Sequence, residues 1–192
     1  MTILITAFEP FGGAETNPSL EAMALVPEQI GQHMICKLLL PVEYTRAASL
    51  MLEEIRRVRP EIVISCGVAN GRKGITPEKL AINYRSAAIA DNADVKYAGV
   101  PIDAAGPAAY MTGLPVERMV EALQAAELPA YLSLSAGAYV CNDVYYALLA
   151  SESELGHRGM FLHVPGVEVA TPEQTARAIV ICIQAAGESL SQ

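Results

Sequence analysis

The sequence is poor in positive charge. Its 192 residues include 13 Lys and Arg against 21 Asp and Glu, which gives a formal net charge of -8. A protein that holds nucleic acid by its phosphates needs a face dense in Lys and Arg. The basic residues here occur mainly in small groups such as Arg56, Arg57 and Arg59. We therefore expect no nucleic-acid partner.

Long hydrophobic runs are also missing. The opening residues, MTILITAFEPFGG, contain an apolar run too short to span a bilayer, and they lack the basic region and cleavage site of a signal peptide. We expect neither export nor a membrane anchor. With 52% hydrophobic and 18% charged residues, the composition suits one globular domain over residues 1–192.

Cysteine is scarce and scattered. Cys36, Cys66, Cys141 and Cys182 are widely spaced and form no C-x-x-C pair, which argues against a disulfide framework or a zinc knuckle. This usage fits a reducing cytoplasm, and we expect no metal site. We interpret Cys36, Cys66 and Cys182 as structural, because they lie within or at the ends of apolar segments.

Large aromatic residues are rare. The chain has no Trp and three Phe, yet Phe8 and Phe11 lie in one short turn, FEPFGG, where core packing is an incomplete explanation. Flat rings beyond the end of a strand could sandwich a flat ligand. The glycine cluster GVANGRKG matches neither the dinucleotide fingerprint nor the P-loop, so a nucleotide site has weak support.

Short apolar runs alternate with amphipathic segments along the chain. This order predicts a mainly parallel sheet with helices on both faces. Residues 67–110 are predicted to be mostly an ordered loop that covers a site. Strands are predicted at 2–6, 34–40, 61–66, 79–84, 130–135 and 159–165, and helices from Asn17 to Pro27 and at 43–59, 115–127, 141–153 and 172–187.

Cys141 and His163 are candidate reactive residues, because ligands bind beyond the carboxyl ends of parallel strands. Cys141 follows the predicted strand 130–135 and begins a helix, whose dipole would stabilise a thiolate. His163 lies near the end of the strand 159–165. Together they could form a nucleophile and a general base. A packed thiol and a core histidine are the alternatives.

A nucleophile and a base of this kind need a third, acidic residue that orients the imidazole. The spacing of the acidic residues in the sequence does not select one of them. Several carboxylates lie in predicted loops, where solvated side chains are the commonest state. Of the other histidines, His33 precedes a strand in a polar turn and His157 lies in a connection predicted to be exposed. The acidic candidates are Glu78, Asp91, Asp94, Asp103 and Glu168.

The chain resembles the pyroglutamyl peptidase I family, cysteine peptidases of family C15 that are also called pyrrolidone-carboxylate peptidases. The resemblance runs nearly end to end and rests on five motifs in order: TAFEPFGGAETNPS, GVANGRKGITPEKLAIN, GPAAYMTGLPVERMV, SAGAYVCN and FLHVP. It implies a single-domain α/β/α sandwich with a twisted, mostly parallel, mixed sheet. It also implies homodimers or homotetramers and no cofactor.

The resemblance further implies a reaction and its residues. The reaction is removal of N-terminal pyroglutamate from peptides through a thioester, with Cys141 as nucleophile, His163 as base and Glu78 as the acid that orients it. An apolar, aromatic pocket would hold the uncharged lactam. The residues implied for this pocket are Phe8, Phe11, Asn17, Val68, Ile89, Tyr139 and Val140.

Some positions differ from the family pattern. Val68 stands where many members carry Gln, Ala138 replaces the Thr of TAGT, Asp143 replaces a His, and Ala88 aligns with an arginine near the active site. Arg72 or Arg85 could substitute for that arginine. The differences at Ala88 and Val68 leave an alternative hypothesis, a pyroglutamyl-peptide or lactam binding protein with weak or lost activity. A third hypothesis, a nucleoside- or phosphate-binding transferase, has little support because this sequence contains no phosphate-binding motif.

Overall fold

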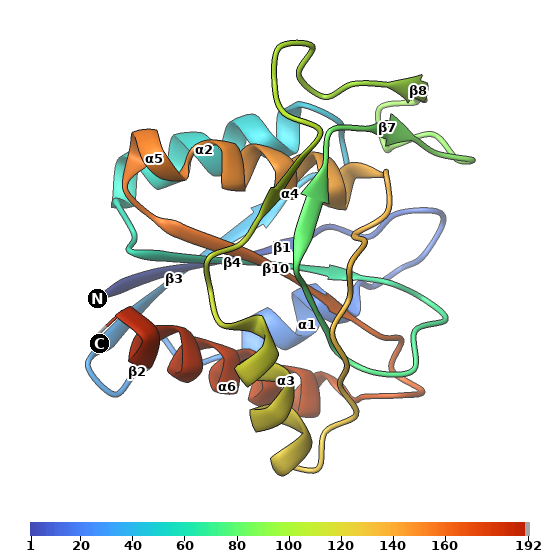
Figure 1. Ribbon diagram of the computed structural model, residues 1–192. Coiled ribbons are helices and arrows are strands. Elements are labelled where there is room, and N and C mark those ends of the chain that lie inside the picture. Colours follow the sequence, from blue (N-terminus) through green and yellow to red (C-terminus); the bar gives the residue numbers. More distant parts are fainter. Residues whose placement is uncertain (191–192) are drawn as a thin grey trace.

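A six-stranded sheet runs through the centre of the molecule (Figure 1). The computed structural model describes residues 1–190; residues 191 and 192, the end of the predicted domain, lie outside the described part. The strand order is β2-β3-β1-β4-β10-β5, and β3, β1, β4 and β10 are parallel, whereas β2 and β5 are antiparallel to their neighbours. The bounds are β1 Thr2–Phe8, β2 Gln29–Ile30, β3 His33–Leu40, β4 Ile62–Val68, β5 Thr76–Glu78 and β10 Arg158–Val164.

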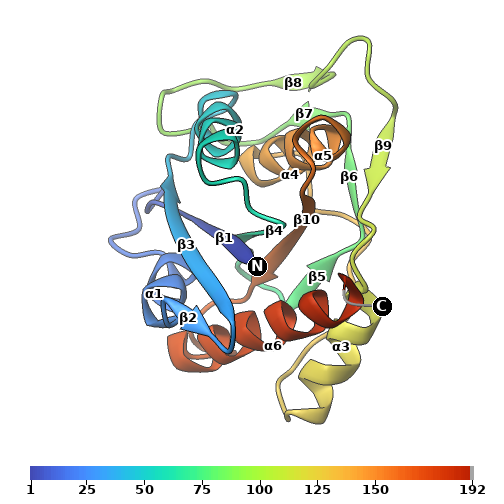
Figure 2. The ribbon, with the colours of Figure 1, turned by 90° about the vertical axis from the view of Figure 1, so that its left-hand side faces the viewer.

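Helices cover both faces of this sheet (Figures 1 and 2). The predicted α/β fold with a mostly parallel, mixed sheet between helical layers is therefore confirmed. No helix within residues 1–190 combines the length and apolar character needed to cross a membrane. One layer contains α1 Pro18–Leu25, α3 Val116–Ala125 and α6 Pro172–Leu190; the other contains α2 Arg46–Val58, α4 Val140–Ala150 and α5 Glu152–Leu155.

The central strands are apolar along their whole length because each of their faces is buried. Successive side chains point to opposite faces. On β1, Ile3 and Ile5 belong to the core under α1, α3 and α6, whereas Leu4 and Phe8 belong to the core under α2 and α4. The same alternation on β10 directs Phe161 toward α2 and α4. His163, two residues further along β10, lies on the same face.

The sequence signals for two helices are confirmed. Asn17 caps α1, because its Oδ1 accepts a hydrogen bond from the backbone N–H of Ser19 at 3.0 Å, and Pro18 is the first helical residue. In α2, Met51 and Ile55 are buried on the face that covers the sheet, as their spacing predicts.

The prediction of a strand at 130–135 is wrong. Only isolated bridges form there, between Ala130 and Ile75 and between Ser133 and Glu78. The position beside β10 is occupied by β5, which comes from the segment predicted to be mostly loop. Residues 130–135 therefore meet only the outer edge of a three-residue strand, and this edge is too short to support a regular ladder.

The long segment 67–110 is ordered and contains, besides β5, further short strands. β6 Leu80–Ile82 pairs with β9 Ala109–Met111, and β7 Arg85–Ser86 pairs with β8 Ala98–Val100, so the predicted strand 79–84 forms only in part. Asn142 in α4 fastens this segment: its Nδ2 donates to the carbonyl of Ile82, and its Oδ1 accepts from the N–H of the same residue. The segment thus lies against the helix that begins beside Cys141.

Candidate active site

Cys141 is the second residue of the eleven-residue helix α4. The residue is partly buried, and its sulfur lies against the α-carbon of Gly67, near the carboxyl end of β4. A Cβ placed on Gly67 would lie 3.0 Å from Sγ of Cys141 and 2.9 Å from Cζ of Phe161. Glycine at this position therefore allows the thiol to approach the sheet.

His163 reaches the same place from the neighbouring strand. It pairs in register with Gly67, and its side chain lies on the face that α4 covers. The side chain is buried, and its ring packs on Phe161 with the two ring centres 4.7 Å apart. The thiol of Cys141 and the imidazole of His163 thus converge on one residue of β4, although 22 positions separate them in the printed sequence.

Glu78 holds the imidazole from the other side. Its Oε1 lies 2.8 Å from Nδ1 of His163, and the carboxyl group is completely buried. An ionised carboxylate only accepts hydrogen bonds, so Nδ1 carries the ring proton and Nε2 keeps its lone pair. The pair therefore presents His163 as a base, with Nε2 as the basic nitrogen.

Arg72 binds the same carboxylate oxygen. Its Nη1 lies 2.7 Å from Oε1 of Glu78 and also donates to the hydroxyl of Thr76, while Nη2 donates to the carbonyl of Ser135 at 3.0 Å. The side chain is one-fifth exposed. Sequence reasoning named Arg72 only as a substitute for a missing arginine and missed its contact with Glu78. Its position in a turn just after β4, where the strand-end rule places ligand sites, is the sequence signal that could have indicated a role.

Arg85, the other arginine considered from the sequence, has different partners. It pairs with the buried carboxylate of Asp143, and its guanidinium lies 5.2 Å from the ring centre of Tyr97 and 5.8 Å from that of Tyr44. These contacts use Asp143, one of the positions that differ from the family pattern, to fasten β7 to α4. Arg85 therefore helps to hold the segment 67–110 against α4.

Burial and charge set the protonation of these groups. Burial, followed by the charge of Glu78, raises the pKa of the Cys141 thiol to about 12. Burial also lowers the pKa of His163, although Glu78 opposes this effect. For Glu78, burial favours the neutral acid, but the hydrogen bond and charge of His163, together with Arg72, outweigh it and hold the pKa below its usual value. The resting site therefore contains a thiol, a neutral imidazole and a carboxylate.

A small apolar cavity opens beside the sulfur of Cys141. Its empty volume is about 230 Å³. Six of the seven pocket residues expected from the resemblance line it, and Ile89 lines a neighbouring hollow that shares Phe11 and Val68. Val42, which was not expected, follows the end of β3, so the strand-end rule could have found it. The lining consists of Phe8, Phe11, Asn17, Val42, Val68, Tyr139, Val140 and Cys141.

Comparison with known proteins agrees with this geometry. Residues 1–190 match the pyroglutamyl peptidase family. The chain belongs to this family. It is 40% identical to the pyrrolidone-carboxylate peptidase of Levilactobacillus brevis over 92% of this chain and 86% of the relative. The corresponding enzyme of Staphylococcus saprophyticus is 42% identical over 91% of this chain and 81% of its own.

Solved structures of pyroglutamyl peptidases share the fold. Pyroglutamyl peptidase I from Bacillus amyloliquefaciens is 35% identical with a TM-score of 0.91, and the match covers 96% of this chain and 94% of that one. A mutant pyrrolidone carboxyl peptidase from Pyrococcus furiosus is 32% identical with a TM-score of 0.94, over 99% of this chain and 100% of that one. The present chain is accordingly a cysteine peptidase by family.

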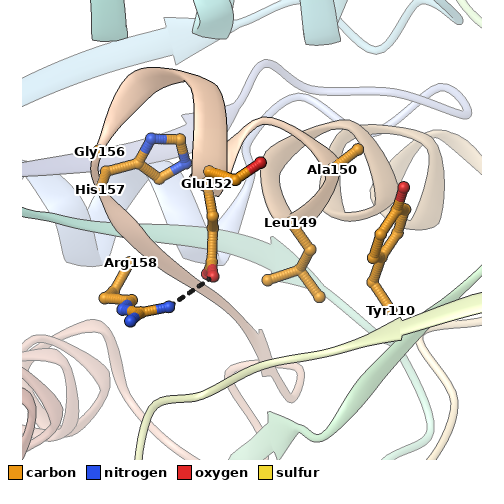
Figure 3. Close-up of a pocket in the computed structure, with 8 residues that line it drawn as sticks. Tyr110, Leu149, Ala150, Glu152, Gly156, His157 and Arg158 are labelled. Carbon is orange, nitrogen blue, oxygen red and sulfur yellow. Dashed lines mark hydrogen bonds and ion pairs between the residues drawn. The ribbon is translucent and has the colours of Figure 1, made fainter.

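Figure 3 shows a larger hollow, which lies at the opposite end of β10 from His163. Arg158, whose guanidinium points toward Glu152 at a distance of 3.4 Å, begins β10, whereas His163 lies near the other end of that strand. This hollow contains no part of the Cys141, His163 and Glu78 group. Its lining residues are Tyr110, Leu149, Ala150, Glu152, Ser153, Gly156, His157 and Arg158.

The prediction that His157 is exposed is wrong. The side chain is 2% exposed, and its Nε2 lies 3.1 Å from the carbonyl oxygen of Leu148. The short helix α5 ends just before Gly156, and the chain then turns directly into β10. This turn places His157 beside the end of α4.

Proposed function

We propose that this chain removes N-terminal pyroglutamate from peptides, with Cys141 as nucleophile, His163 as general base and acid, and Glu78 as the group that orients His163. The observation that carries the assignment is the buried contact between Glu78 and His163, located where the thiol of Cys141 meets the sheet beside an aromatic cavity. Family membership supports the substrate class.

The reaction proceeds in two halves. Nε2 of His163 takes the thiol proton while the sulfur attacks the pyroglutamyl carbonyl carbon; the C–N bond then breaks, and the imidazolium gives its proton to the departing amine. In the second half, His163 takes a proton from water, which attacks the thioester. The S–C bond breaks and the sulfur regains a proton, so that pyroglutamate leaves.

The neutral resting state gives Glu78 a definite task. Because the thiol and the imidazole are both uncharged before reaction, a proton transfer creates charge inside a buried site. The carboxylate stabilises the imidazolium that forms. Its pKa is held below the usual value mainly by the hydrogen bond and charge of His163, to which the ion pair with Arg72 adds a smaller contribution.

The first turn of α4 supplies one backbone donor for the oxyanion, the N–H of Cys141. The N–H groups of Asn142 and Asp143 already donate to the carbonyl of Tyr139. The N–H of Cys141 faces its own sulfur, where it opposes the rise of the thiol pKa. An oxygen that becomes negative beside the sulfur is thus close to this N–H and to the positive end of the helix dipole.

The cavity favours an uncharged ring. None of its lining side chains carries a charge, so a free ammonium would find no carboxylate there. Asn17 lines the wall, but its Oδ1 accepts from the N–H and the hydroxyl of Ser19, and its Nδ2 donates to the carbonyl of Glu9. Asn17 therefore shapes the pocket mainly through the turn that it holds together.

Three further expectations complete the proposal. The chain acts as one peptidase domain, residues 1–192, in the cytoplasm; the cysteines of the described residues are all free, which suits a reducing compartment. It assembles as a homodimer or homotetramer, and exposed apolar side chains in the segment 67–110, such as Val95, provide contact surface.

The direct test uses a pyroglutamyl arylamide. The purified protein is expected to release the chromophore, and prolonged treatment with iodoacetamide or the substitution Cys141→Ala should abolish release. Cys182→Ala provides the control, because Cys182 is buried in α6 away from the cavity. Tight binding of the arylamide without release would instead support the lactam-binding alternative that Val68 and Ala88 suggest.

A further inference from the structure

A second hollow continues outward from the cavity beside Cys141. The two share Phe11 and Val68, so one wall serves both. Among the lining residues of this outer hollow, only Glu168 carries a charge. The lining consists of Phe11, Gly12, Ala14, Thr16, Pro18, Val68, Asn70, Ile89, Gly166, Val167 and Glu168.

Glu168 projects over the turn that follows β10. Both oxygens of its carboxylate lie against the α-carbon of Gly166, where a Cβ would collide with them. Gly166 comes three residues after His163 in the sequence. The side chain of Glu168 is exposed, and within residues 1–190 it forms no ion pair. Its charge is therefore available to a ligand in the outer hollow.

We propose that the outer hollow binds the peptide portion that follows pyroglutamate, and that Glu168 makes it favour a cationic side chain over an acidic one. This inference rests on the proposed function. When the pyroglutamyl ring occupies the inner cavity, the scissile carbonyl lies at Cys141 and the departing amine must face His163. The rest of the peptide then continues past the end of β10, where residues 166–168 line the outer hollow.

The lining suits a lysine or arginine side chain. Ile89 and Val167 offer apolar contact to the aliphatic stem, while the carboxylate of Glu168 receives the charged head. Because the site is open to solvent, salt will screen the attraction, and its effect is modest. We expect kcat/KM for a lysine side chain to exceed that for an uncharged one by roughly two- to fivefold, as for a solvent-exposed ion pair.

The test compares amidated dipeptides that differ only after pyroglutamate: pyroglutamyl-lysinamide, the uncharged pyroglutamyl-norleucinamide and the amide of pyroglutamyl-glutamate. We expect kcat/KM to fall in that order at low ionic strength. The substitution Glu168→Gln should lower the ratio between the lysine and glutamate substrates at least about threefold, and Glu168→Lys should invert it. High salt should shrink the ratio of the unmodified protein.

Glu53→Gln is the matched control. It removes the same charge from an exposed position in the middle of α2 that lines neither hollow, so the substrate ratio should stay as in the unmodified protein. A ratio that is equal in Glu168→Gln and in Glu53→Gln would overturn the assignment of the outer hollow while leaving the peptidase intact. Absence of thiol-dependent release from the arylamide itself would overturn the proposed function and this inference together.

Discussion

The sulfur of Cys141 lies against the bare α-carbon of Gly67, so that a strand residue without a side chain brings the thiol beside the strand that carries His163. The thiol can approach the strand this closely only because Gly67 has no side chain. The ring of Phe161 fills the space on the other side, and its Cζ lies 2.9 Å from where a Cβ on Gly67 would be.

We therefore expect Gly67→Ala to displace the thiol. The added methyl group meets Phe161 and Cys141, and such overpacking costs about 1–3 kcal/mol of stability. The activity should fall more than tenfold, because misplacement of a reacting group by an ångström is costly. Thermal unfolding and kcat/KM measure the two effects. Gly113→Ala is the control, since its Cβ meets only Arg158, at 3.9 Å; equal activity of the two variants would contradict the prediction.

Glu78→Gln should leave His163 in place with its orientation and charge support impaired. We expect kcat to fall about 10²- to 10⁴-fold, as when the acid of a comparable triad is neutralised. Glu78 opposes the lowering of the His163 pKa, so its loss should lower that pKa further. The acidic limb of the kcat/KM profile, where His163 becomes protonated, should then move to lower pH. An unshifted limb with normal kcat would exclude Glu78 from this role.

Arg72→Met tests the cation beside Glu78. Since the folded-state pKa of Glu78 is held below its usual value, the ionised carboxylate contributes stability above its unfolded pKa and loses it as pH falls through the folded value. Without Arg72 this contribution shrinks. The variant should be less stable than the unmodified protein at pH 7, and the difference should narrow in acid, as followed by urea unfolding. A deficit independent of pH would show that Arg72 acts only by packing.

The thiol of Cys141 should react slowly at neutral pH in the absence of substrate. Burial raises its pKa to about 12, so the thiolate fraction grows with pH throughout the neutral and alkaline range. Mass spectrometry of carbamidomethylated Cys141 at several pH values gives the rate profile. We expect a continuous increase above pH 9. A plateau beginning near pH 6 would reveal a preformed thiolate and imidazolium pair and would refute the neutral resting state.

Phe11→Ala should weaken substrate binding. The ring lines both hollows and lies with its centre 6.2 Å from that of Tyr139. Removing an aromatic wall of this kind should raise KM about tenfold or more, with a smaller effect on kcat, because the contact is made in the ground state as well. Tyr131→Ala removes an exposed aromatic ring outside the cavity and serves as the control. Steady-state kinetics on the arylamide would show an unchanged KM if Phe11 were not part of the pocket.

Local patterns were sufficient for much of the fold. The apolar runs of β1, β4 and β10 and the cap at Asn17 follow from side-chain chemistry within a few residues, and the structure confirms them. The prediction for 130–135 was wrong because two segments competed for one sheet edge. The three residues of β5, TPE at 76–78, have no hydrophobic pattern that predicts a strand beside β10.

By itself, the sequence determined the alternating fold, the residue types at the strand ends and the set of possible acids and bases. Periodicity and turn chemistry are local properties, so they can be read along the chain. Only the tertiary structure decided that Glu78 contacts His163, because the two residues lie 85 positions apart in the chain. It also decided that the turn between β4 and β5 brings Arg72 back onto the carboxylate of Glu78. The protonation of Cys141 depends in turn on how deeply the folded chain encloses it.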